Sequence, residues 1–156
     1  MPSTEPRLLY LVKRVELAAR ARIDEIVRPA GLTTNQYTAL TVLEGHDDMS
    51  SAQLARHSFV TAQSMADMIT TLEARGLIER HRDRADRRRL VVGLTAEGRV
   101  LLDRYRDEVA ALEDSMLTGL TEQDTAALRS SMNTCYDNLS LAPVRVAGRE
   151  QGVGAE

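Results

Sequence analysis

The chain has 156 residues, 43% hydrophobic and 28% charged, with a net charge of −3 and a single cysteine. This length suits one domain, and one cysteine excludes an internal disulfide framework and a cysteine-based zinc cluster. The sequence has no apolar run of about 18 residues and no signal-peptide pattern at its start. We therefore expect a cytoplasmic globular protein without a membrane partner, and its low aromatic content of 3% favours helices.

Basic residues are concentrated in one short segment. Residues 75–89 hold seven arginines against three acidic residues, a local net charge of +4, whereas the remainder holds 13 basic and 20 acidic residues, a net of −7. Ionic screening acts over about 8 Å at physiological salt, so a phosphate near this segment would experience mainly the local charge. The acidic chain as a whole therefore does not exclude nucleic acid as a partner.

The first two predicted elements are helices. Apolar residues recur every three or four positions over 7–27, which predicts an amphipathic helix that the sequence RPAGL at 28–32 ends. Thr33 and Gln36 have capping-box spacing at the start of a second helix, which ends at Gly45.

A helix-turn-helix pattern follows. Ser50 and Gln53 predict another capping box at the start of a short helix over 50–58. The stretch 60–77 predicts the next helix, with Thr61 as its N-cap. Two capped helices joined by a few residues are typical of a helix-turn-helix.

After Gly76 the pattern becomes that of a β-hairpin. The runs LIERHRD and RRLVVGL flank a polar centre, and Leu90, Val92 and Leu94 share one face of the second strand. A helix from Thr95 to about Thr118 comes next, and its expected apolar stripe is Leu101, Leu102, Tyr105, Val109, Leu112 and Met116. The fold class is therefore mainly α, in the order α-α-α-α-ββ-α-α.

The last helix is expected to begin at Thr121 and reach about Leu139. Residues 142–156 lack periodicity and are expected to be disordered. Cys135 in this helix is interpreted as a buried structural thiol. The three histidines are dispersed in the sequence and predict no metal site, and no residue spacing predicts a catalytic site or a cofactor.

An arginine-rich hairpin beside a helix-turn-helix has a geometric use. When the second helix lies in a major groove, the hairpin can place arginine in the neighbouring minor groove. Asp86 could pair with Arg88 across the tip and orient its side chain. Taken alone, an arginine-rich hairpin is more often a solvated face than a DNA contact.

The hairpin also carries a family signature. The sequence DRRRLVVGLT resembles the D-x-R-x(5)-L-T wing motif of the multiple antibiotic resistance regulator (MarR) family, with Asp86, Arg88, Leu94 and Thr95 at the defining places. GLTTNQYTAL, LARH and LEARGLIER add to the resemblance, which covers about residues 7–140. It implies a winged helix-turn-helix regulator that binds a pseudo-palindromic operator in double-stranded DNA as a homodimer.

The resemblance also implies a domain layout. The N-terminal helix, within 1–32, and the C-terminal helices, within 96–141, would form the dimer, and 33–95 would bind DNA. Both outer segments are richer in apolar residues than a small winged-helix core could cover, which agrees with burial in a two-fold dimer.

The residues expected to contact DNA lie on the recognition helix and the wing. The stretch TAQSMADMITTLEA contains no lysine or arginine, whereas family members often have a basic residue near the position of Asp67. Base and phosphate contacts would then involve neutral groups, with affinity resting on the wing. The candidates are Thr61, Gln63, Ser64, Arg84, Arg87, Arg88 and Arg89, although Gln63 and Ser64 could equally be plain exposed polar residues.

The resemblance also implies a transcriptional regulator, a repressor released by a small aromatic or phenolic effector. Lys13, Arg14, Arg20 and Tyr37 could line an effector cleft, or the cations could pair with Glu16, Asp24 and Glu25. An alternative is a helical dimer that sequesters a small molecule or binds a protein without recognising an operator. No feature of the sequence favours an enzyme.

Overall fold

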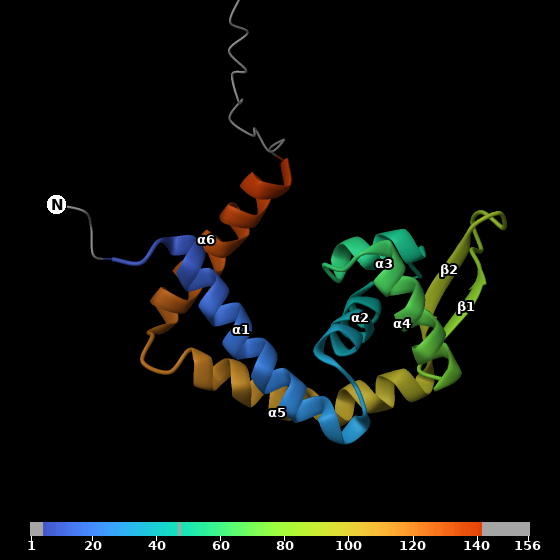
Figure 1. The fold of residues 1–156 in the computed structure, drawn as a ribbon, viewed down its shortest axis with the longest axis horizontal. Helices are drawn as coiled ribbons and strands as arrows, with labels where there is room; N and C mark the ends of the chain where they lie inside the picture. Colours follow the sequence, from blue (N-terminus) through green and yellow to red (C-terminus); the bar gives the residue numbers. More distant parts are fainter. Residues whose placement is uncertain (1–4, 47, 142–156) are drawn as a thin grey trace, which may run out of the picture. The chain divides into compact units, whose positions relative to one another are not determined.

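The structure is a computed structural model that describes residues 5–46 and 48–141 (Figure 1). These residues contain six α-helices, one 3₁₀ turn and two strands, in the α-α-α-α-ββ-α-α order predicted from the sequence. They fall into two compact units, one ending at Asp114 and the other beginning at Ser115. Among the described residues no helix is both long and apolar enough to cross a membrane. The predicted disordered tail, 142–156, lies outside the described residues.

The first helices end and begin at the predicted signals. Helix α1 (Leu8–Val27) passes into a 3₁₀ turn, η1 (Arg28–Ala30), which ends at Gly31 with φ 66°. This left-handed conformation suits glycine because it has no Cβ. Helix α2 (Thr34–Gly45) begins with the predicted capping box, in which the Thr33 hydroxyl accepts from the Gln36 amide at 3.2 Å. Both helices were therefore correctly predicted.

Helices α3 (Ser51–His57) and α4 (Ala62–Ala74) form the predicted helix-turn-helix. Ser50 and Gln53 cap α3 as expected, and the Thr61 side chain caps α4. The turn between the helices contains Phe59, which has φ 58°, a left-handed conformation that costs a non-glycine residue about 1–2 kcal/mol. The sequence contained no signal for this strained position.

Strands β1 (Ile78–Arg82) and β2 (Leu90–Leu94) form the predicted antiparallel hairpin, with Ile78 opposite Leu94. Figure 1 shows it extending beyond α4. Both Val91 and Val92 are buried, whereas Leu90 is 49% exposed, so burial does not follow the simple alternation that was expected. An isolated β-bridge, with N–O distances of 3.1 and 2.7 Å, pairs Met49 with Val92 and covers β2 from the side of the segment before α3.

Helix α5 (Ala96–Met116) completes the core of the first unit. The Thr95 hydroxyl accepts from the Gly98 amide at 3.0 Å, and Leu102 and Tyr105 are buried. The far end of the predicted stripe is not buried, because Met116 is 51% exposed.

Helix α6 (Glu122–Leu141) begins where Thr121 and Asp124 cap each other, as predicted. None of its described side chains is buried, so the expectation that Cys135 is a buried thiol was wrong for the single chain. Its large apolar side chains Leu128, Met132, Tyr136 and Leu139 are between 42% and 74% exposed.

Candidate nucleic-acid interface

One face of α4 is buried and the other presents polar groups to solvent. Met65, Ile69 and Leu72 are buried in the core, which fixes the rotation of the helix. The predicted residues Thr61, Gln63 and Ser64 are all exposed at its N-terminal end. The backbone amides of a first helical turn favour anions, so this end suits a phosphate.

One of the three predicted residues, Thr61, also caps the helix, and it is bonded to a second, Ser64. The Thr61 hydroxyl accepts from the Ser64 amide at 3.1 Å and donates to the Ser64 hydroxyl at 3.0 Å. Both hydroxyls are therefore held in fixed positions. A phosphate or a base could still bind here, because the Ser64 hydroxyl keeps its proton for donation and both hydroxyl oxygens keep a lone pair.

Gln63 lies one turn before Asp67 on the exposed face. Its Nε2 is 3.4 Å from the Asp67 Oδ1, a long hydrogen bond that directs part of the amide toward the carboxylate. Thr70 and Thr71 donate to the carbonyls one turn earlier in the helix. The exposed face thus has one acidic and no basic side chain, and Asp67 remains available as an acceptor.

The wing tip is ordered by two aspartates that bind the backbone. Asp83 accepts from the Ala85 amide at 2.8 Å, and Asp86 accepts from the Arg88 amide at 3.0 Å. The predicted pairing of Asp86 with Arg88 is corrected here: the contact is made to the main chain of Arg88. Asp86 therefore shapes the turn from which the arginines project.

Four of the seven clustered arginines have contacts within the fold. The Arg75 guanidinium binds the carbonyls of Ala30 and Gly31 at 2.5 and 3.2 Å. Arg80 pairs with Glu73, lowering the pKa of that carboxyl through hydrogen bonds. The other two are Arg82, whose guanidinium lies 3.3 Å from the Arg88 carbonyl, and Arg89.

Arg89 was predicted to contact DNA, but it ties the wing to α3. Its guanidinium lies 3.5 Å from the Asp83 carboxylate and donates to the Gln53 Oε1 at 3.3 Å. The same Gln53 oxygen accepts from the Ser50 amide at 2.9 Å. One amide thus joins the cap of α3 to the point where the wing loop enters β2, a role that the sequence did not reveal.

The remaining three arginines are exposed at the wing tip. Among the described residues, none forms a hydrogen bond or an ion pair with the side chains of Arg84, Arg87 or Arg88. Their planar, permanently charged forks suit bidentate contacts to phosphate or base-edge acceptors. The wing therefore presents a charge of +3 on groups that no internal contact restrains.

A second contact supports the wing at its root. The His81 Nε2 lies 2.7 Å from the Asp48 Oδ2, and Gly93 makes room for that carboxylate, because a Cβ there would lie 2.6 Å from the Asp48 Oδ1. Together with the Met49–Val92 bridge, this contact attaches the hairpin to the segment before α3.

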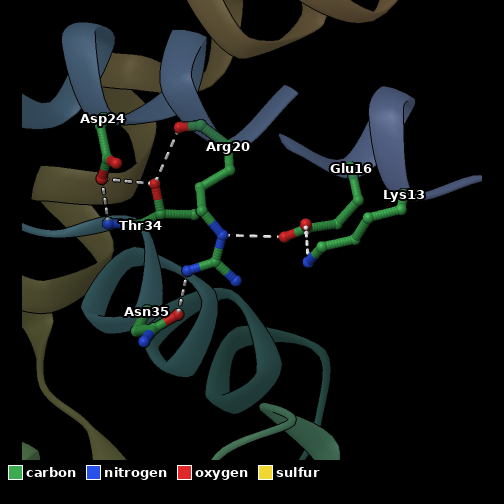
Figure 2. Close-up of polar contacts among 6 residues, drawn as sticks. All are labelled: Lys13, Glu16, Arg20, Asp24, Thr34 and Asn35. Atoms are coloured by element: carbon green, nitrogen blue, oxygen red, sulfur yellow. Dashed lines mark hydrogen bonds and ion pairs between the residues drawn. The ribbon is translucent and has the colours of Figure 1, made fainter. Parts of the chain in front are cut away.

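The cations predicted to line an effector cleft have partners on their own helix. Figure 2 shows the Glu16 carboxylate between Lys13, at 3.0 Å, and Arg20, at 2.8 Å. These two hydrogen bonds lower the pKa of Glu16, and the bond from Arg20 has the larger effect. Arg20 also donates to the Asn35 Oδ1 at 3.1 Å. The sequence left open whether these cations line a cleft or pair with acidic residues, and in the structure Lys13 and Arg20 pair with Glu16.

The other two residues predicted for the cleft have contacts of their own. The Arg14 guanidinium stacks over the Tyr10 ring, 5.8 Å from its centre. Tyr37 is only 8% exposed, and burial raises the pKa of its phenol.

Asp24 anchors α2 to α1 beside this network (Figure 2). Its Oδ1 accepts from the Thr34 hydroxyl at 2.6 Å and from the Thr34 amide at 2.8 Å. Both bonds lower the pKa of Asp24, and the bond from the Thr34 hydroxyl has the larger effect. The carboxylate also faces the N-terminus of α2, where the helix dipole favours negative charge.

Two of the three histidines lie together, although they are dispersed in the sequence. The rings of His46, at the end of α2, and His57, at the end of α3, have centres 5.1 Å apart. Within the described part of the chain, no group of three or more histidine, cysteine or acidic residues is arranged to hold a metal ion.

Comparison with known proteins gives a consistent result. A profile of the MarR family matches residues 30–89. The HTH-type transcriptional repressor Rv2887 of Mycobacterium tuberculosis is 36% identical over 112 residues, 72% of this chain and 81% of that protein. A MarR-family transcriptional regulator from Silicibacter pomeroyi has a TM-score of 0.77 at 26% identity, covering 86% of this chain and 91% of its own. The repressor CouR, solved with a 23-mer DNA duplex, has a TM-score of 0.71 at 29% identity, covering 83% of this chain and 96% of its own.

Proposed function

The chain belongs to the MarR family, and on that premise we propose that it is a sequence-specific DNA-binding repressor that acts as a homodimer in the cytoplasm. The observation that carries this proposal is the unpaired group of Arg84, Arg87 and Arg88 on a wing whose turn is fixed by Asp83 and Asp86. A fixed turn with free cations suits a minor groove or phosphate backbone. We assign the protein no catalytic activity.

The recognition helix would read the operator with neutral groups. Gln63 can bind adenine bidentately and Asp67 can accept from a cytosine amino group, while Thr61 and Ser64 bind phosphate or base edges. Because Arg89 already contacts Gln53 and Asp83, we assign it a supporting role in the wing. Residues 33–95 would form the DNA-binding lobe.

A homodimer would cover the exposed apolar residues of α1, α5 and α6. Large apolar side chains are between 42% and 78% exposed on these helices, far more than scattered surface residues would explain. The residues concerned are Leu8, Leu9, Tyr10, Val12, Val15, Leu17, Val100, Met116, Leu128, Met132, Tyr136 and Leu139. We therefore assign 1–32 and 96–141 to dimerisation, which sedimentation equilibrium would test.

An effector would act by favouring one separation of the two recognition helices. Half-sites one helical turn apart, about 34 Å, demand a fixed separation of these helices. A small aromatic or phenolic anion that binds only the mismatched conformation would lower DNA affinity by its differential affinity for the two states. For its site we retain Lys13, Arg14, Arg20 and Tyr37, where binding must displace the Glu16 carboxylate from Lys13 and Arg20.

The test is selection of bound duplexes from a random-sequence pool at about 150 mM salt. At this concentration, charges more than about 8 Å apart are largely screened, so close contacts dominate the binding. The wild type should recover a motif with two-fold symmetry, and Arg88→Ala should recover it weakly. If neither protein enriches a motif, the proposal fails, and a helical dimer that sequesters a small molecule becomes the better account.

A further inference from the structure

We propose that His46 and His57 form a binding site for a divalent transition-metal ion. The two histidines are eleven positions apart in the sequence and at the ends of different helices, yet their ring centres are 5.1 Å apart and their planes are tilted by 58°. Both side chains are exposed, so an ion can reach them from solvent.

The spacing of the rings matches that of two imidazoles on one ion. With metal–nitrogen bonds of about 2.0–2.1 Å at a tetrahedral angle, the centres of two ligating imidazole rings lie roughly 5 Å apart. The observed separation of 5.1 Å needs little adjustment. The tilt of 58° is also compatible with two ligands, since parallel stacking would keep the nitrogens from meeting at one point.

The hydrogen bond of His46 leaves one of its nitrogens free to ligate. Its Nδ1 lies 2.8 Å from the Val42 carbonyl oxygen, which can only accept, so Nδ1 carries the proton. The Nε2 then has a free lone pair, as a metal ligand requires. A ring nitrogen that donates to a backbone carbonyl is the usual outer contact of a ligating histidine, because it fixes the ring and raises its basicity.

The second ligand is similarly available. Neither ring nitrogen of His57 is hydrogen-bonded to another described residue, so one can bind an ion without breaking an existing bond. The third histidine, His81, is instead bound to Asp48. It therefore serves as a control within the same chain.

The position of the pair favours a cation. His46 is the C-cap of α2, a helix of 12 residues, and His57 is the last residue of α3. The carbonyl groups at the end of a helix carry its partial negative charge. Two imidazoles suit Zn²⁺, Ni²⁺ or Cu²⁺, with water completing the coordination shell. The bound ion would link the end of α2 to the turn between α3 and α4.

The experiment uses the full chain without a histidine tag, titrated with ZnCl₂ by calorimetry at pH 7.5. We expect one Zn²⁺ per chain, with affinity at least about tenfold weaker in His46→Ala and in His57→Ala, since each removes one of two protein ligands. The control His81→Gln should bind as the wild type does. Binding should weaken at pH 5.5, because protons compete for the imidazoles.

A second readout is independent of the calorimetry and of DNA. Zn²⁺ that binds only the folded chain must raise its melting temperature, and the double variant His46→Ala/His57→Ala should lose this rise. The electron paramagnetic resonance spectrum of the Cu²⁺ complex should show coupling to two nitrogens. Equal Zn²⁺ binding by the wild type and the double variant, or loss of binding in His81→Gln alone, would overturn the proposal.

Discussion

Arg89, the last residue of the wing loop before β2, donates to the side-chain oxygen of Gln53 in the first turn of α3, at 3.3 Å. The two residues are 36 positions apart in the sequence, and the same oxygen accepts from the Ser50 amide. The wing is therefore connected to the helix-turn-helix by a specific side-chain bond as well as by the chain itself. This connection can position the free arginines relative to α4.

The Gln53–Arg89 contact should be measurable as a coupling in DNA binding. Gln53→Ala and Arg89→Ala should each weaken binding, and the double variant should weaken it by less than the sum. Groups in one hydrogen-bond network typically show coupling of about 0.5 kcal/mol or more. Fluorescence anisotropy with the selected duplex gives the three dissociation constants. Strict additivity would show that the contact does not position the wing.

Asp86 should support DNA binding through the shape of the turn. Asp86→Ala removes the acceptor for the Arg88 amide, and losing such a bond costs about 1 kcal/mol. If this cost falls on the bound conformation, DNA affinity should fall about fivefold per protomer, and about 30-fold for a homodimer that carries the substitution in both wings. Asp86→Asn keeps an oxygen acceptor and should retain affinity near that of the wild type. An equal loss in both variants would instead assign the effect to the charge of Asp86.

The N-terminal capping pairs were predictable because they act locally. Thr33 with Gln36 and Ser50 with Gln53 lie three residues apart, a spacing that brings the groups together in any helix start. The contacts of Arg75 and Arg89 could not be predicted in this way. They reach 44 and 36 positions along the chain, and an arginine that binds the fold has the same sequence signature as one that binds a partner.

The apolar pattern of the outer helices was informative only in part. It correctly predicted the helices, but it assigned Met116 and Cys135 to a buried face, and both are exposed in the single chain. Periodicity shows that a face is apolar and does not show whether the same chain covers it. Phe59 was missed for another reason, since a left-handed conformation at a residue other than glycine has no sequence signature.

Asp24 should make stability depend on pH in the acid range. Its pKa is lowered in the folded chain, so its contribution is complete above its ordinary pKa near 3.8 and is lost as the pH falls through the lowered value. Asp24→Asn should reduce the free energy of unfolding by about 1 kcal/mol at pH 7 and by less at pH 3. Urea unfolding at both pH values tests this. A difference that stays the same at pH 3 would contradict it, and Glu25→Gln is the control on the same helix.

At position 59, glycine should give a more stable protein than alanine, the reverse of their usual order in helices. In a helix interior glycine is less stable than alanine by roughly 0.5–1 kcal/mol, but at φ 58° glycine avoids the clash of a Cβ. Phe59→Gly should therefore be more stable than Phe59→Ala by about 1 kcal/mol. Thermal unfolding of the two variants measures the difference. Greater stability of Phe59→Ala would mean that the turn does not require this conformation.

The salt dependence of DNA binding tests the central claim most directly. A plot of the logarithm of DNA affinity against the logarithm of salt concentration has a slope of about −0.9 per phosphate contact. A dimer that loses one contact in each protomer should therefore have a slope that is less steep by about 2. We predict this change for Arg87→Ala or Arg88→Ala, with no change for Arg104→Ala, an exposed arginine on α5. The same slope and affinity in the wing variants as in the wild type would contradict the assignment of the wing to DNA.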